Sequence, residues 1–583
     1  MTTTNQSLRS GTWQACLQCS ASFEITKDDL AFLEKLSPEI GGRKIPLPLP
    51  TQCPDCRLRR RMACVNQLSL YERTCDLTGA SIISNLRPDS PYKVYRQEDW
   101  HSDKWDALEY GREFDFSKPF FDQWRDLCLA VPRPSLFTGY EFDENSAYTN
   151  HSGKNKDCYL IFDSDENRDC YYSYSINSCV NCLDCFRVRK SELCHQCVDC
   201  VRCYGSSYLQ DCDNCSDSMF LKNCTGCKHC LMCSNLKNKD YHVENKPVSK
   251  EEYERFRSML ASHDAIASAA ARFAALKLEY PQKSMHGIQN ENVRGDYLVN
   301  CKDAQFCFDS EDLWDCRYCF QAFMPLKNCM DIQECGDGEL LYECSVAGYK
   351  AHASLFCSHM LAAFSNLLYC SLCPHSNDCF GCIGVQRKKH CILNKQYTKE
   401  EYEKLVPKII EHMRSDGGGA LNRASGASSG SWGEFFPITI STYAYNESLA
   451  QDYYPMTKSD VMKNGWQWLD EVEKRDQYLG PKVDLPDTIA ETTDDICKKI
   501  LTCETSGMQY KIIPQELKFY RQMNLPLPHS SFFARHKARM ALRNARKLFE
   551  RKCDKCSKEI ETTYSPERVE KIYCERCYLE AVY

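Results

Sequence analysis

Two sets of four cysteines have the residue types and the spacing of a structural metal site. A CxxC pair places two thiolates on one tight turn, and two such pairs can surround one Zn²⁺ tetrahedrally. In the C-terminal set 17 residues separate the two pairs, which is typical of a zinc ribbon. In the N-terminal set 33 residues separate them, and two unrelated structural turns are the alternative. We predict two zinc ions, held by Cys16, Cys19, Cys53, Cys56 and by Cys553, Cys556, Cys574, Cys577.

The residues between and after the N-terminal pairs indicate the elements that must position them. The segment ITKDDLAFLEKL has helical apolar spacing, and Thr26 is its expected N-cap. The second pair, CPDC, leads directly into the basic run RLRRR. The sequence therefore predicts a module in which both cysteine pairs flank a helix.

This module occurs twice in the chain. Residues 503–523 (CETSGMQYKIIPQELKFYRQM) align without a gap on residues 16–36 (CLQCSASFEITKDDLAFLEKL). After a shorter loop, ARHKARMALRNARKLFERKCDKC aligns on CRLRRRMACVNQLSLYERTCDLT. We interpret the N-terminal and C-terminal modules as copies of one ancestral unit with two metal sites.

Each copy has kept a different site. The N-terminal copy retains Cys75 of the second quartet, and the C-terminal copy retains Cys503 of the first. Thr78, Arg96 and Asp99 stand where three further ligands would be, so we place no zinc there. This complementary loss indicates that each quartet acts as a unit.

The stretch from Cys158 to Cys233 holds fifteen cysteines, all at multiples of three residues from one another. Self-similarity at a fixed period is the signature of a repeat architecture. We predict a narrow, β-helix-like solenoid with a 15-residue coil, whose lumen is filled by small, readily buried cysteines. Asp or Asn, which tolerates tight turns, often precedes the cysteine. The main predicted column is Cys170, Cys185, Cys200, Cys215 and Cys230.

A second cysteine-rich stretch is a degenerate duplicate of the first. Residues 228–253 align without a gap on residues 377–402, at an offset of 149. The three-residue phase slips between Cys319 and Cys329 and again around Cys357, which we interpret as insertions at corners. We therefore predict a second solenoid.

Both cysteine-rich stretches end in the same pattern, N-K-x-x-[ST]-K-E-E-Y. Ser249 opens a capping box in the first copy, and a helix is predicted from there to about Leu278. Such helices would cap the open coil ends.

These features predict a mainly β, multi-domain chain with zinc-ribbon modules at both ends. The predicted segments are an N-terminal module (1–100), an aromatic helical linker whose aromatic residues pack in a core (101–144), a first solenoid with its helix (145–280), a second solenoid with its helix (281–414), a flexible Gly/Ser linker (415–433), a segment without assigned chemistry (434–495) and a C-terminal module (496–583).

Composition bounds the compartment and the partners. The chain has 583 residues, 41 of them cysteine, and a net charge of −7, so any basic surface must be local. The first residues, MTTTNQSLRSGTWQA, have no apolar h-region, and no apolar run approaches the length of a membrane helix. We expect a cytoplasmic protein whose thiols are reduced or bind metal.

The chain resembles a known family at its C-terminal end. CDKCSKEIETTYSPERVEKIYCERCY, preceded by ARHKARMALRNARKLFERK, is similar to the family called the probable zinc-ribbon domain. The chain as a whole resembles large, cysteine-rich, uncharacterised bacterial proteins that carry this domain at their ends. The resemblance implies zinc at the four C-terminal cysteines and implies no reaction, because that family has no established activity.

Local charge is compatible with nucleic-acid binding. Basic residues cluster beside each cysteine quartet, as a phosphate-binding surface would require. The alternative is that these side chains pair with carboxylates of the chain itself. The candidate contacts are Arg57, Arg59, Arg60, Arg61, Arg535, Lys537, Arg539, Arg543, Arg546 and Lys547.

Three functions remain open from the sequence. One is a zinc-stabilised scaffold or interaction protein of unknown partner, and another is docking on nucleic acid or a ribonucleoprotein. The third is a redox or metal-handling protein that uses the solenoid cysteines, since His195, His229 and His390 adjoin cysteines. Reactive thiols need exposure, whereas cysteines in a lumen would be buried. The chain has no P-loop, H-E-x-x-H or G-x-S-x-G motif, so we expect no enzyme.

Overall fold

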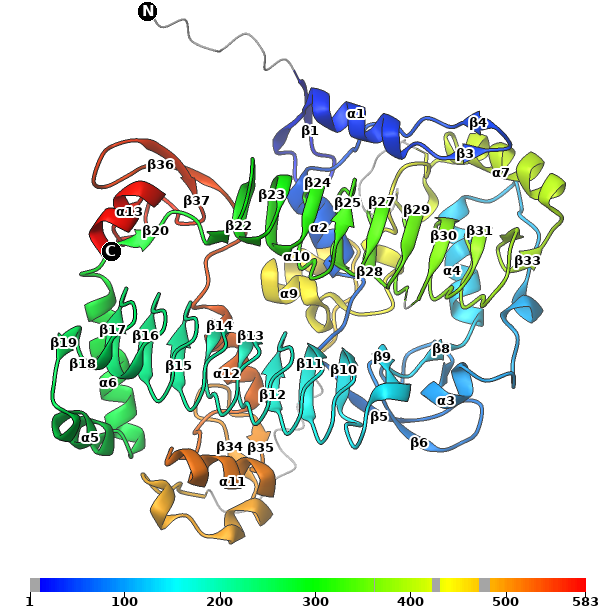
Figure 1. Cartoon of the computed structure of the whole chain (residues 1–583). Coiled ribbons are helices and arrows are strands. Elements are labelled where there is room, and N and C mark those ends of the chain that lie inside the picture. Colours follow the sequence, from blue (N-terminus) through cyan, green and yellow to red (C-terminus); the bar gives the residue numbers. More distant parts are fainter. Residues whose placement is uncertain (1–10, 361, 422–429, 471–482, 583) are drawn as a thin grey trace, which may run out of the picture. The chain divides into compact units, whose positions relative to one another are not determined.

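The structure is a computed structural model that describes residues 11–360, 362–421, 430–470 and 483–582. The chain divides into two compact units, each built from two separate stretches. Unit 1 comprises residues 1–135 and 285–469, and unit 2 comprises residues 136–284 and 470–583. Each unit therefore joins one terminal module to one cysteine-rich sheet that is not its neighbour in sequence (Figure 1).

Sheet 1, in unit 2, has 11 strands that follow one another in chain order. All neighbours are parallel except the last pair. Its strands are β9 (Thr138–Gly139), β10 (Thr149–Gly153), β11 (Tyr159–Asp165), β12 (Tyr171–Tyr174), β13 (Phe186–Arg189), β14 (Val198–Val201), β15 (Ser207–Gln210), β16 (Met219–Lys222), β17 (Lys228–Ser234), β18 (Asp240–Val243) and β19 (Lys246–Pro247).

The register of sheet 1 is 12 residues, and the predicted 15-residue coil is wrong. Phe186 pairs with Val198 and Val198 with Gln210, and isolated bridges outside the strands repeat the same offset. Cys170 therefore lies beside Cys182 and not beside Cys185: the backbone N–H of Cys182 donates to Cys170 Sγ at 3.4 Å. A spacing of three residues fits both periods, because 12 and 15 are both multiples of three.

The cysteines face inward because every third residue turns the chain. The residue before each inward cysteine is in the left-handed region, as Asp169 (φ 53°) and Asn181 (φ 48°) are, in agreement with the predicted tight turns. Each thiol donates to the carbonyl two residues earlier, for example Cys170 Sγ to Arg168 O at 3.3 Å. Serine does the same at Ser206. Small donors therefore occupy these positions, and the buried carbonyls are paired.

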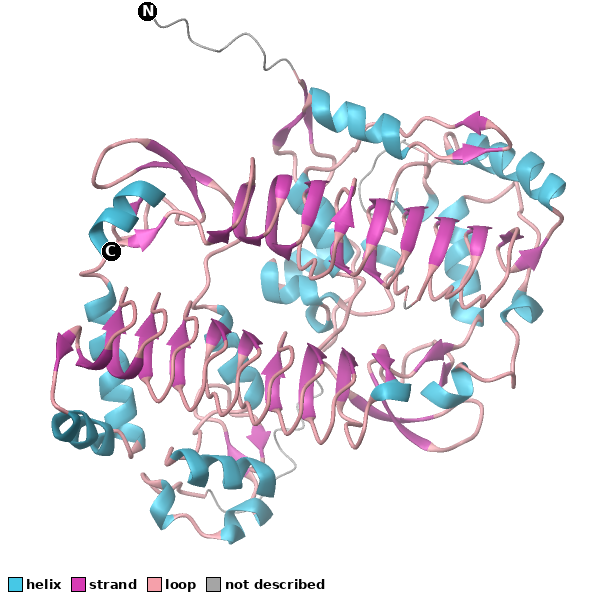
Figure 2. Cartoon of the chain, in the orientation of Figure 1, coloured by secondary structure: helices cyan, strands magenta, loops and turns pink. Residues whose placement is uncertain are grey.

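Sheet 2, in unit 1, also has 11 strands and a less regular register (Figure 2). Its strands are β21 (Gly287–Ile288), β22 (Arg294–Val299), β23 (Lys302–Glu311), β24 (Leu313–Arg317), β25 (Leu326–Lys327), β27 (Gly338–Tyr342), β29 (Ala351–Leu355), β30 (Phe364–Leu368), β31 (Asn377–Phe380), β32 (Cys391–Ile392) and β33 (Lys395–Gln396), with the separate pair β26 (Gln333–Cys335) and β28 (Ser345–Ala347).

One-residue insertions account for the irregular register of sheet 2. The offset is 12 residues between β30 and β31, but 13 between Leu313 and Leu326 and between Leu355 and Leu368. These longer repeats coincide with the phase slips at Cys319–Cys329 and around Cys357. The predicted corner insertions are confirmed.

Helices follow both sheets where the capping boxes predicted them. Ser249 caps α5 (Lys250–Met259) by accepting from Glu252 N–H, and Thr398 caps α7 (Lys399–Met413) by accepting from Glu401 N–H. The single helix predicted to Leu278 is two helices, because α5 ends at Met259 and α6 (His263–Lys277) begins after a new cap at Ser262.

The two modules are built on four antiparallel hairpins. In unit 1 these are β1 (Thr12–Ala15) with β2 (Ser22–Ile25), and β5 (Tyr71–Thr74) with β6 (Ser81–Ser84). In unit 2 they are β34 (Leu501–Thr502) with β35 (Gln509–Tyr510), and β36 (Phe549–Lys552) with β37 (Glu559–Thr562). The helices between the hairpins are α1 (Lys27–Leu36) and α2 (Pro54–Met62) in unit 1, and α11 (Pro514–Met523) and α12 (Phe532–Met540) in unit 2.

The remaining elements connect or cover these parts. They are β3 (Glu39–Ile40), β4 (Arg43–Lys44), β7 (Val94–Tyr95), α3 (Gln97–Trp100), α4 (Phe120–Ala130), β8 (Arg133–Pro134), α9 (Leu449–Tyr453) and α10 (Lys458–Lys463) in unit 1, and β20 (Gln282–Lys283), β38 (Ile572–Tyr573) and α13 (Glu575–Val582) in unit 2.

The aromatic residues of the predicted linker form a core, as expected, with one exception. Phe120 packs on Tyr369 of sheet 2, and Trp124 packs on Phe436 at 4.3 Å between ring centroids. Phe116 is 47% exposed and lies outside this core.

The predicted Gly/Ser linker is ordered where the structure describes it. Trp432 is buried and donates from Nε1 to Pro46 O, and Ser431 Oγ donates to Asp416 at 2.7 Å. Residues 422–429 of this linker and residues 471–482 of the following segment lie outside the described residues.

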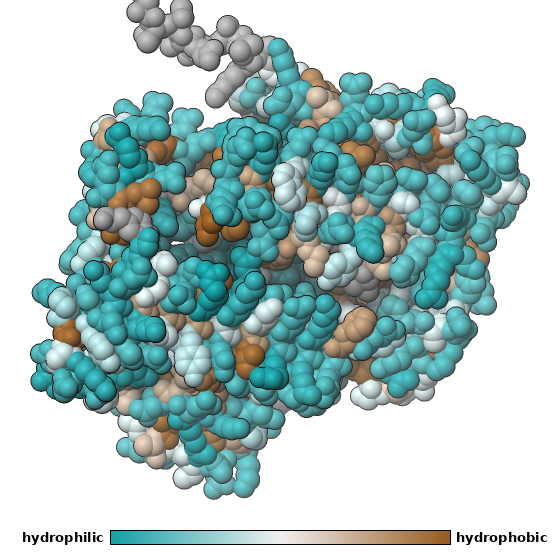
Figure 3. Space-filling view, in the orientation of Figure 1, coloured by the Kyte–Doolittle hydropathy of each residue, from teal (hydrophilic) through white to brown (hydrophobic). Residues whose placement is uncertain are grey.

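The surface gives no sign of a membrane span. Within the described ranges, every helix is too short or too polar to cross a bilayer. Figure 3 shows one face of the molecule, on which hydrophilic residues predominate and hydrophobic residues are scattered.

Candidate metal centres

The N-terminal quartet is assembled by one hairpin and one helix. Cys16 and Cys19 lie on the turn after β1, Cys53 is the N-cap of α2, and Cys56 lies in its first turn. The four Sγ atoms lie within 4.8 Å of one another, and the Cys19 and Cys53 sulfurs are 3.8 Å apart. A tetrahedron with Zn–S bonds of about 2.3 Å has edges of about 3.8 Å, so the quartet fits zinc.

The C-terminal quartet repeats this geometry at β36 and α13. Cys553 and Cys556 lie on the turn after β36, and Cys574 and Cys577 lie at the start of α13. The sulfurs of Cys556 and Cys574 are again 3.8 Å apart, and all four are within 4.8 Å. The backbone N–H of Cys574 donates to Cys553 Sγ at 3.3 Å.

Backbone donors prepare these sulfurs for metal. Burial raises the pKa of Cys553, but N–H groups of Cys574, Cys556 and Lys555 outweigh it and lower that pKa to about 6. The thiolate form is the one that binds zinc. The two clusters are suited to bind two zinc ions, and in each cluster three cysteines are buried while one, Cys19 or Cys556, is exposed.

The tight turn that presents the first two ligands survives where the metal ligands are lost. Ser20 (φ 62°) donates its N–H to Cys16 O at 2.8 Å, and Ser557 does the same for Cys553. Gly79 and Gly507 form the same contact at Cys75 and Cys503, with φ of 74° and 69°.

Other contacts replace the metal at the two reduced sites. Arg96 N–H donates to Cys75 Sγ at 3.3 Å, and the Arg96 guanidinium pairs with Asp99 at 3.1 Å. At the other site Cys503 Sγ lies 3.2 Å from Thr505 Oγ1. Hydrogen bonding therefore holds each turn where only one cysteine remains.

A third group of potential ligands was not expected from the sequence. His263, Asp264 and Asp487 bring three ligand atoms within 4.8 Å at the start of α6. Asp264 N–H donates to Asp487 Oδ1 at 3.2 Å, and His263 N–H donates to Asp487 O at 2.9 Å. Carboxylates at a helix N-terminus are stabilised by the helix dipole, which disfavours a cation there. We interpret this group as a helix cap formed by residues 223 apart in sequence.

The basic residues of α2 are buried against carboxylates of unit 1. Arg57, Arg60 and Arg61 are at most 3% exposed. Their partners are Asp331 for Arg57 (2.7 Å) and Arg61 (3.4 Å), and Glu343 (2.8 Å) and Glu434 (2.7 Å) for Arg60. We call these six residues the unit 1 clamp.

The basic residues of α12 are buried in the same way in unit 2. Asp184 is fully buried and pairs with Arg535 Nε at 2.8 Å and with Arg539 at 3.1 Å. We call Arg535, Arg539 and Asp184 the unit 2 clamp. Burial opposes ionisation, but Arg535 and Arg539 hold the pKa of Asp184 below its usual value.

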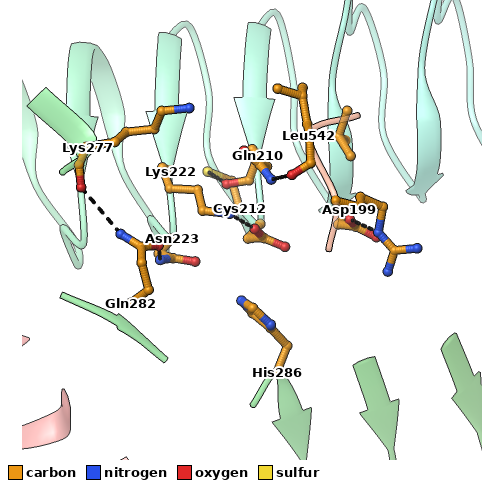
Figure 4. A network of polar contacts seen from close by, with 12 residues as sticks. Asp199, Gln210, Cys212, Lys222, Asn223, Lys277, Gln282, His286 and Leu542 are labelled. Atoms are coloured by element: carbon orange, nitrogen blue, oxygen red, sulfur yellow. Dashed lines mark hydrogen bonds and ion pairs between the residues drawn. The ribbon is translucent and has the colours of Figure 1, made fainter. Parts of the chain in front are cut away.

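Further contacts of the C-terminal module run along neighbouring repeats of sheet 1. Figure 4 shows Asp199, Gln210, Lys222 and Asn223 on successive strands or turns. Asp199 pairs with Arg543 at 2.8 Å, Gln210 donates to Leu542 O, and Asn223 donates to Gln282. Lys222 pairs with Asp211 within the sheet.

The placement of the predicted phosphate contacts therefore favours internal pairing. Arg57, Arg60, Arg61, Arg535 and Arg539 are buried and face carboxylates, instead of lying on a surface open to nucleic acid. Arg59 lies over Trp466 and donates to Cys56 Sγ at 3.6 Å. Arg543 and Arg546 are partly buried, and Lys537 and Lys547 are exposed.

The inward cysteines are inert in chemical terms. All described cysteines are free thiols, and those inside both sheets are at most 3% exposed. Burial raises the pKa of Cys170 and raises that of Cys344 to about 12, so the thiol form prevails. The histidines beside them pack as rings: His195 on Tyr520, His229 on Tyr241 and His390 on Tyr402.

Comparison with known proteins assigns no family to this chain. No family model matches it, and no curated protein matches it. Among solved structures, a putative acetyltransferase from Desulfovibrio desulfuricans G20 is similar at 10% identity, with a TM-score of 0.09. That match covers 40% of this chain and 65% of the other, less than two thirds, and it is too distant to bear on fold or function. The two four-cysteine clusters are therefore the main guide to function.

Proposed function

We propose that this protein is a zinc-stabilised scaffold that binds protein partners and catalyses no reaction. One observation carries the proposal: each four-cysteine cluster has tetrahedral spacing and sits in a module whose basic helix is fixed to a cysteine-rich sheet by buried ion pairs. Structural zinc contributes folding free energy directly, and buried ion pairs fix relative placement.

Each cysteine-rich sheet is the core of a closed, four-sided solenoid in this proposal. In sheet 1, bridges with the 12-residue offset occur at four positions of the repeat, represented by Lys156, Asp165, Tyr171 and Tyr174. Four such positions, three residues apart, support one short side each. A solenoid offers long lateral surfaces, which suit an extended partner.

A protein partner is favoured over nucleic acid by the burial of the basic residues. A phosphate-binding surface needs accessible Lys and Arg side chains. Five of the ten candidate side chains are instead buried in ion pairs, and a net charge of −7 adds no general attraction.

A redox role for the inward cysteines is disfavoured by their burial and raised pKa. We assign them a packing role and place the protein in the cytoplasm, where such thiols stay reduced.

The test combines metal content with partner binding. Elemental analysis of protein purified without added metal is expected to give two zinc ions per chain. Fluorescence anisotropy with random-sequence RNA and duplex DNA in 50 mM salt (roughly the salt at which phosphate contacts bind tightly) is expected to give no binding. Partners that co-purify from the native host should persist after nuclease treatment. Zinc content below two, or partners released by nuclease, would overturn the proposal.

A further inference from the structure

Helix α2 carries two functions in adjacent turns. Its first turn supplies two ligands of the N-terminal centre, because Cys53 is the N-cap and Cys56 is the third helical residue. The next residue is Arg57, and Arg60 and Arg61 follow one turn later. A rigid helix of 9 residues therefore joins the metal centre directly to the unit 1 clamp.

The clamp tolerates little displacement of that helix. Arg57 Nε lies 2.7 Å from Asp331, and Arg60 contacts Glu343 and Glu434 at 2.8 and 2.7 Å. The three arginines and three carboxylates balance in charge, and none of the six is more than 8% exposed as a residue. A shift of α2 would separate buried charges that water cannot reach, which is unfavourable.

The metal ligands outside α2 hold its first turn in place. Cys53 N–H donates to Cys16 Sγ at 3.3 Å, and Leu17 N–H donates to Thr51 O at 3.1 Å. Arg59, on the same helix, donates to Cys56 Sγ and lies over Trp466. Without metal, four thiols would remain where a tetrahedron had fixed the β1–β2 turn to α2.

Unit 2 provides an internal comparison, because its clamp helix has no metal ligands. In α12 the N-cap is Ser531, and Ala534 stands at the position of Cys56. Arg535 and Arg539 nonetheless pair with Asp184 as Arg57 and Arg61 pair with Asp331. The zinc ligands of unit 2 lie instead on the turn after β36 and on α13.

From this contrast we infer that zinc binding at the N-terminal centre and closure of the unit 1 clamp are energetically coupled, whereas the unit 2 clamp is independent of zinc. This inference rests on the proposed zinc centres. Metal loss at Cys16, Cys19, Cys53 and Cys56 releases α2 from sheet 2. Coupling is reciprocal, so weakening the clamp lowers the affinity of the N-terminal centre for zinc.

The first experiment measures that reciprocity with a matched control. In a Cys556→Ser background the N-terminal centre is the remaining four-cysteine cluster among the described residues. Asp331→Asn is expected to weaken zinc affinity, measured by competition with a chromogenic chelator, by roughly 5- to 150-fold. Asp184→Asn, the same change in the unit 2 clamp, is expected to leave it unchanged. Equal effects of both variants, or none from Asp331→Asn, would overturn the coupling.

Spectroscopy follows the clamp itself. All eight tryptophans, including Trp466 beside Arg59, belong to unit 1, so their fluorescence reports that unit. Chelation of the full chain should shift their emission to the red and should increase hydrogen exchange in α2 and near Asp331 and Glu343. Exchange in α12 should stay the same. Unchanged exchange in α2 after confirmed metal loss would disprove the release.

Two further controls keep the outcomes distinct. Glu434→Gln weakens the clamp more gently than Asp331→Asn and serves if the latter does not fold, with a smaller loss of affinity expected. If the protein binds two zinc ions but no clamp variant changes affinity, the coupling fails and the zinc scaffold stands. If the quartets bind no zinc, both proposals fail.

Discussion

Arg57 donates its Nε–H to Oδ2 of Asp331 at 2.7 Å in a site where the two side chains are 3% and 0% exposed. The guanidinium also lies over the ring of Tyr318, 5.3 Å from its centroid. Arginine suits such a site because its planar head can stack and pair at once. A residue that the sequence suggests as a surface contact is therefore an anchor between module and sheet.

The same arrangement recurs in unit 2. Arg535 donates to Asp184 at 2.8 Å and lies over Tyr172 at 5.5 Å. The sequence alignment of the two modules places Arg535 opposite Arg57. The duplicated modules thus attach to their sheets by the same tyrosine–arginine–aspartate contact.

Loss of the Arg57 contact should destabilise unit 1. Arg57→Met leaves the Asp331 carboxylate with only the longer contact to Arg61, and removing one member of a buried pair typically costs about 3–5 kcal/mol. Urea unfolding followed by tryptophan fluorescence will measure the change. Lys537→Met is the control, because this exposed residue of α12 should change stability by no more than about 0.5 kcal/mol.

A double variant separates pairing from packing. Arg57→Met with Asp331→Leu removes both charges and should recover part of the loss caused by Arg57→Met alone. A double variant that is as unstable as the sum of the single changes would show that Arg57 acts through packing on Tyr318 instead.

The C-terminal centre should behave as one zinc site. Replacing Cys553 and Cys574 by Ser is expected to remove about one zinc equivalent and to unfold the β36–β37 hairpin, because structural zinc stabilises the fold that binds it. Elemental analysis and hydrogen exchange of residues 549–562 will test this. Retention of two zinc ions would contradict the assignment.

Unit 2 should lose stability as the pH rises, through Glu516. Burial raises the pKa of this 1% exposed carboxyl to about 8, although Arg535 opposes the shift. Its contribution is complete below the model value of 4.5 and is lost as the pH rises through about 8. Glu516→Gln should remove this dependence, which amounts to at most about 1.4 kcal/mol per pH unit.

Far-UV circular dichroism during urea unfolding at several pH values, compared with tryptophan fluorescence for unit 1, will measure the effect. The gap in unfolding free energy between Glu516→Gln and the parent protein should widen from pH 5 to pH 8. A constant gap would mean that Glu516 is ionised in the folded protein.

The inward columns should accept small hydrogen-bonding residues and reject large ones. Cys170→Ser keeps a donor for Arg168 O and an acceptor for Cys182 N–H, as Ser206 does for its own neighbours. Cys170→Leu overfills the column and should destabilise unit 2 by about 1–3 kcal/mol. Thermal unfolding will compare the two. Equal losses would refute the packing role of the thiols.

The metal centres could be predicted because their signal is local and chemical. Two thiols three residues apart lie on one turn, and each quartet needs only two such turns. The complementary loss at Cys75 and Cys503 strengthened the prediction further, and the retained turns at Gly79 and Gly507 confirm that both modules have one ancestry.

The coil length could not be predicted because the cysteine pattern leaves it open. Cys170 stands at a multiple of three from both Cys182 and Cys185. The choice between them depends on backbone pairing across the coil, such as Cys182 N–H to Cys170 Sγ, which no side-chain pattern records.

The role of the arginines was hidden for a different reason. Asp331 lies 274 residues from Arg57, and Asp184 lies in the middle of the cysteine-rich stretch. Both aspartates read as turn residues, and they do hold left-handed turns (φ 58° and 56°). Their carboxylates point away from the column, so one residue serves both the turn and the clamp.

The 12-residue register has a consequence for how the chain can change in length. A repeat of sheet 1 pairs only with its neighbours, so gaining or losing one whole repeat would leave every other pairing intact. The C-terminal module limits this freedom, because α12 contacts Asp184 and α13 contacts Asn235 through Tyr578. These points lie about four repeats, or roughly 20 Å, apart. The module thereby fixes the number of repeats between them, and evolution is free to add or remove repeats only beyond its reach.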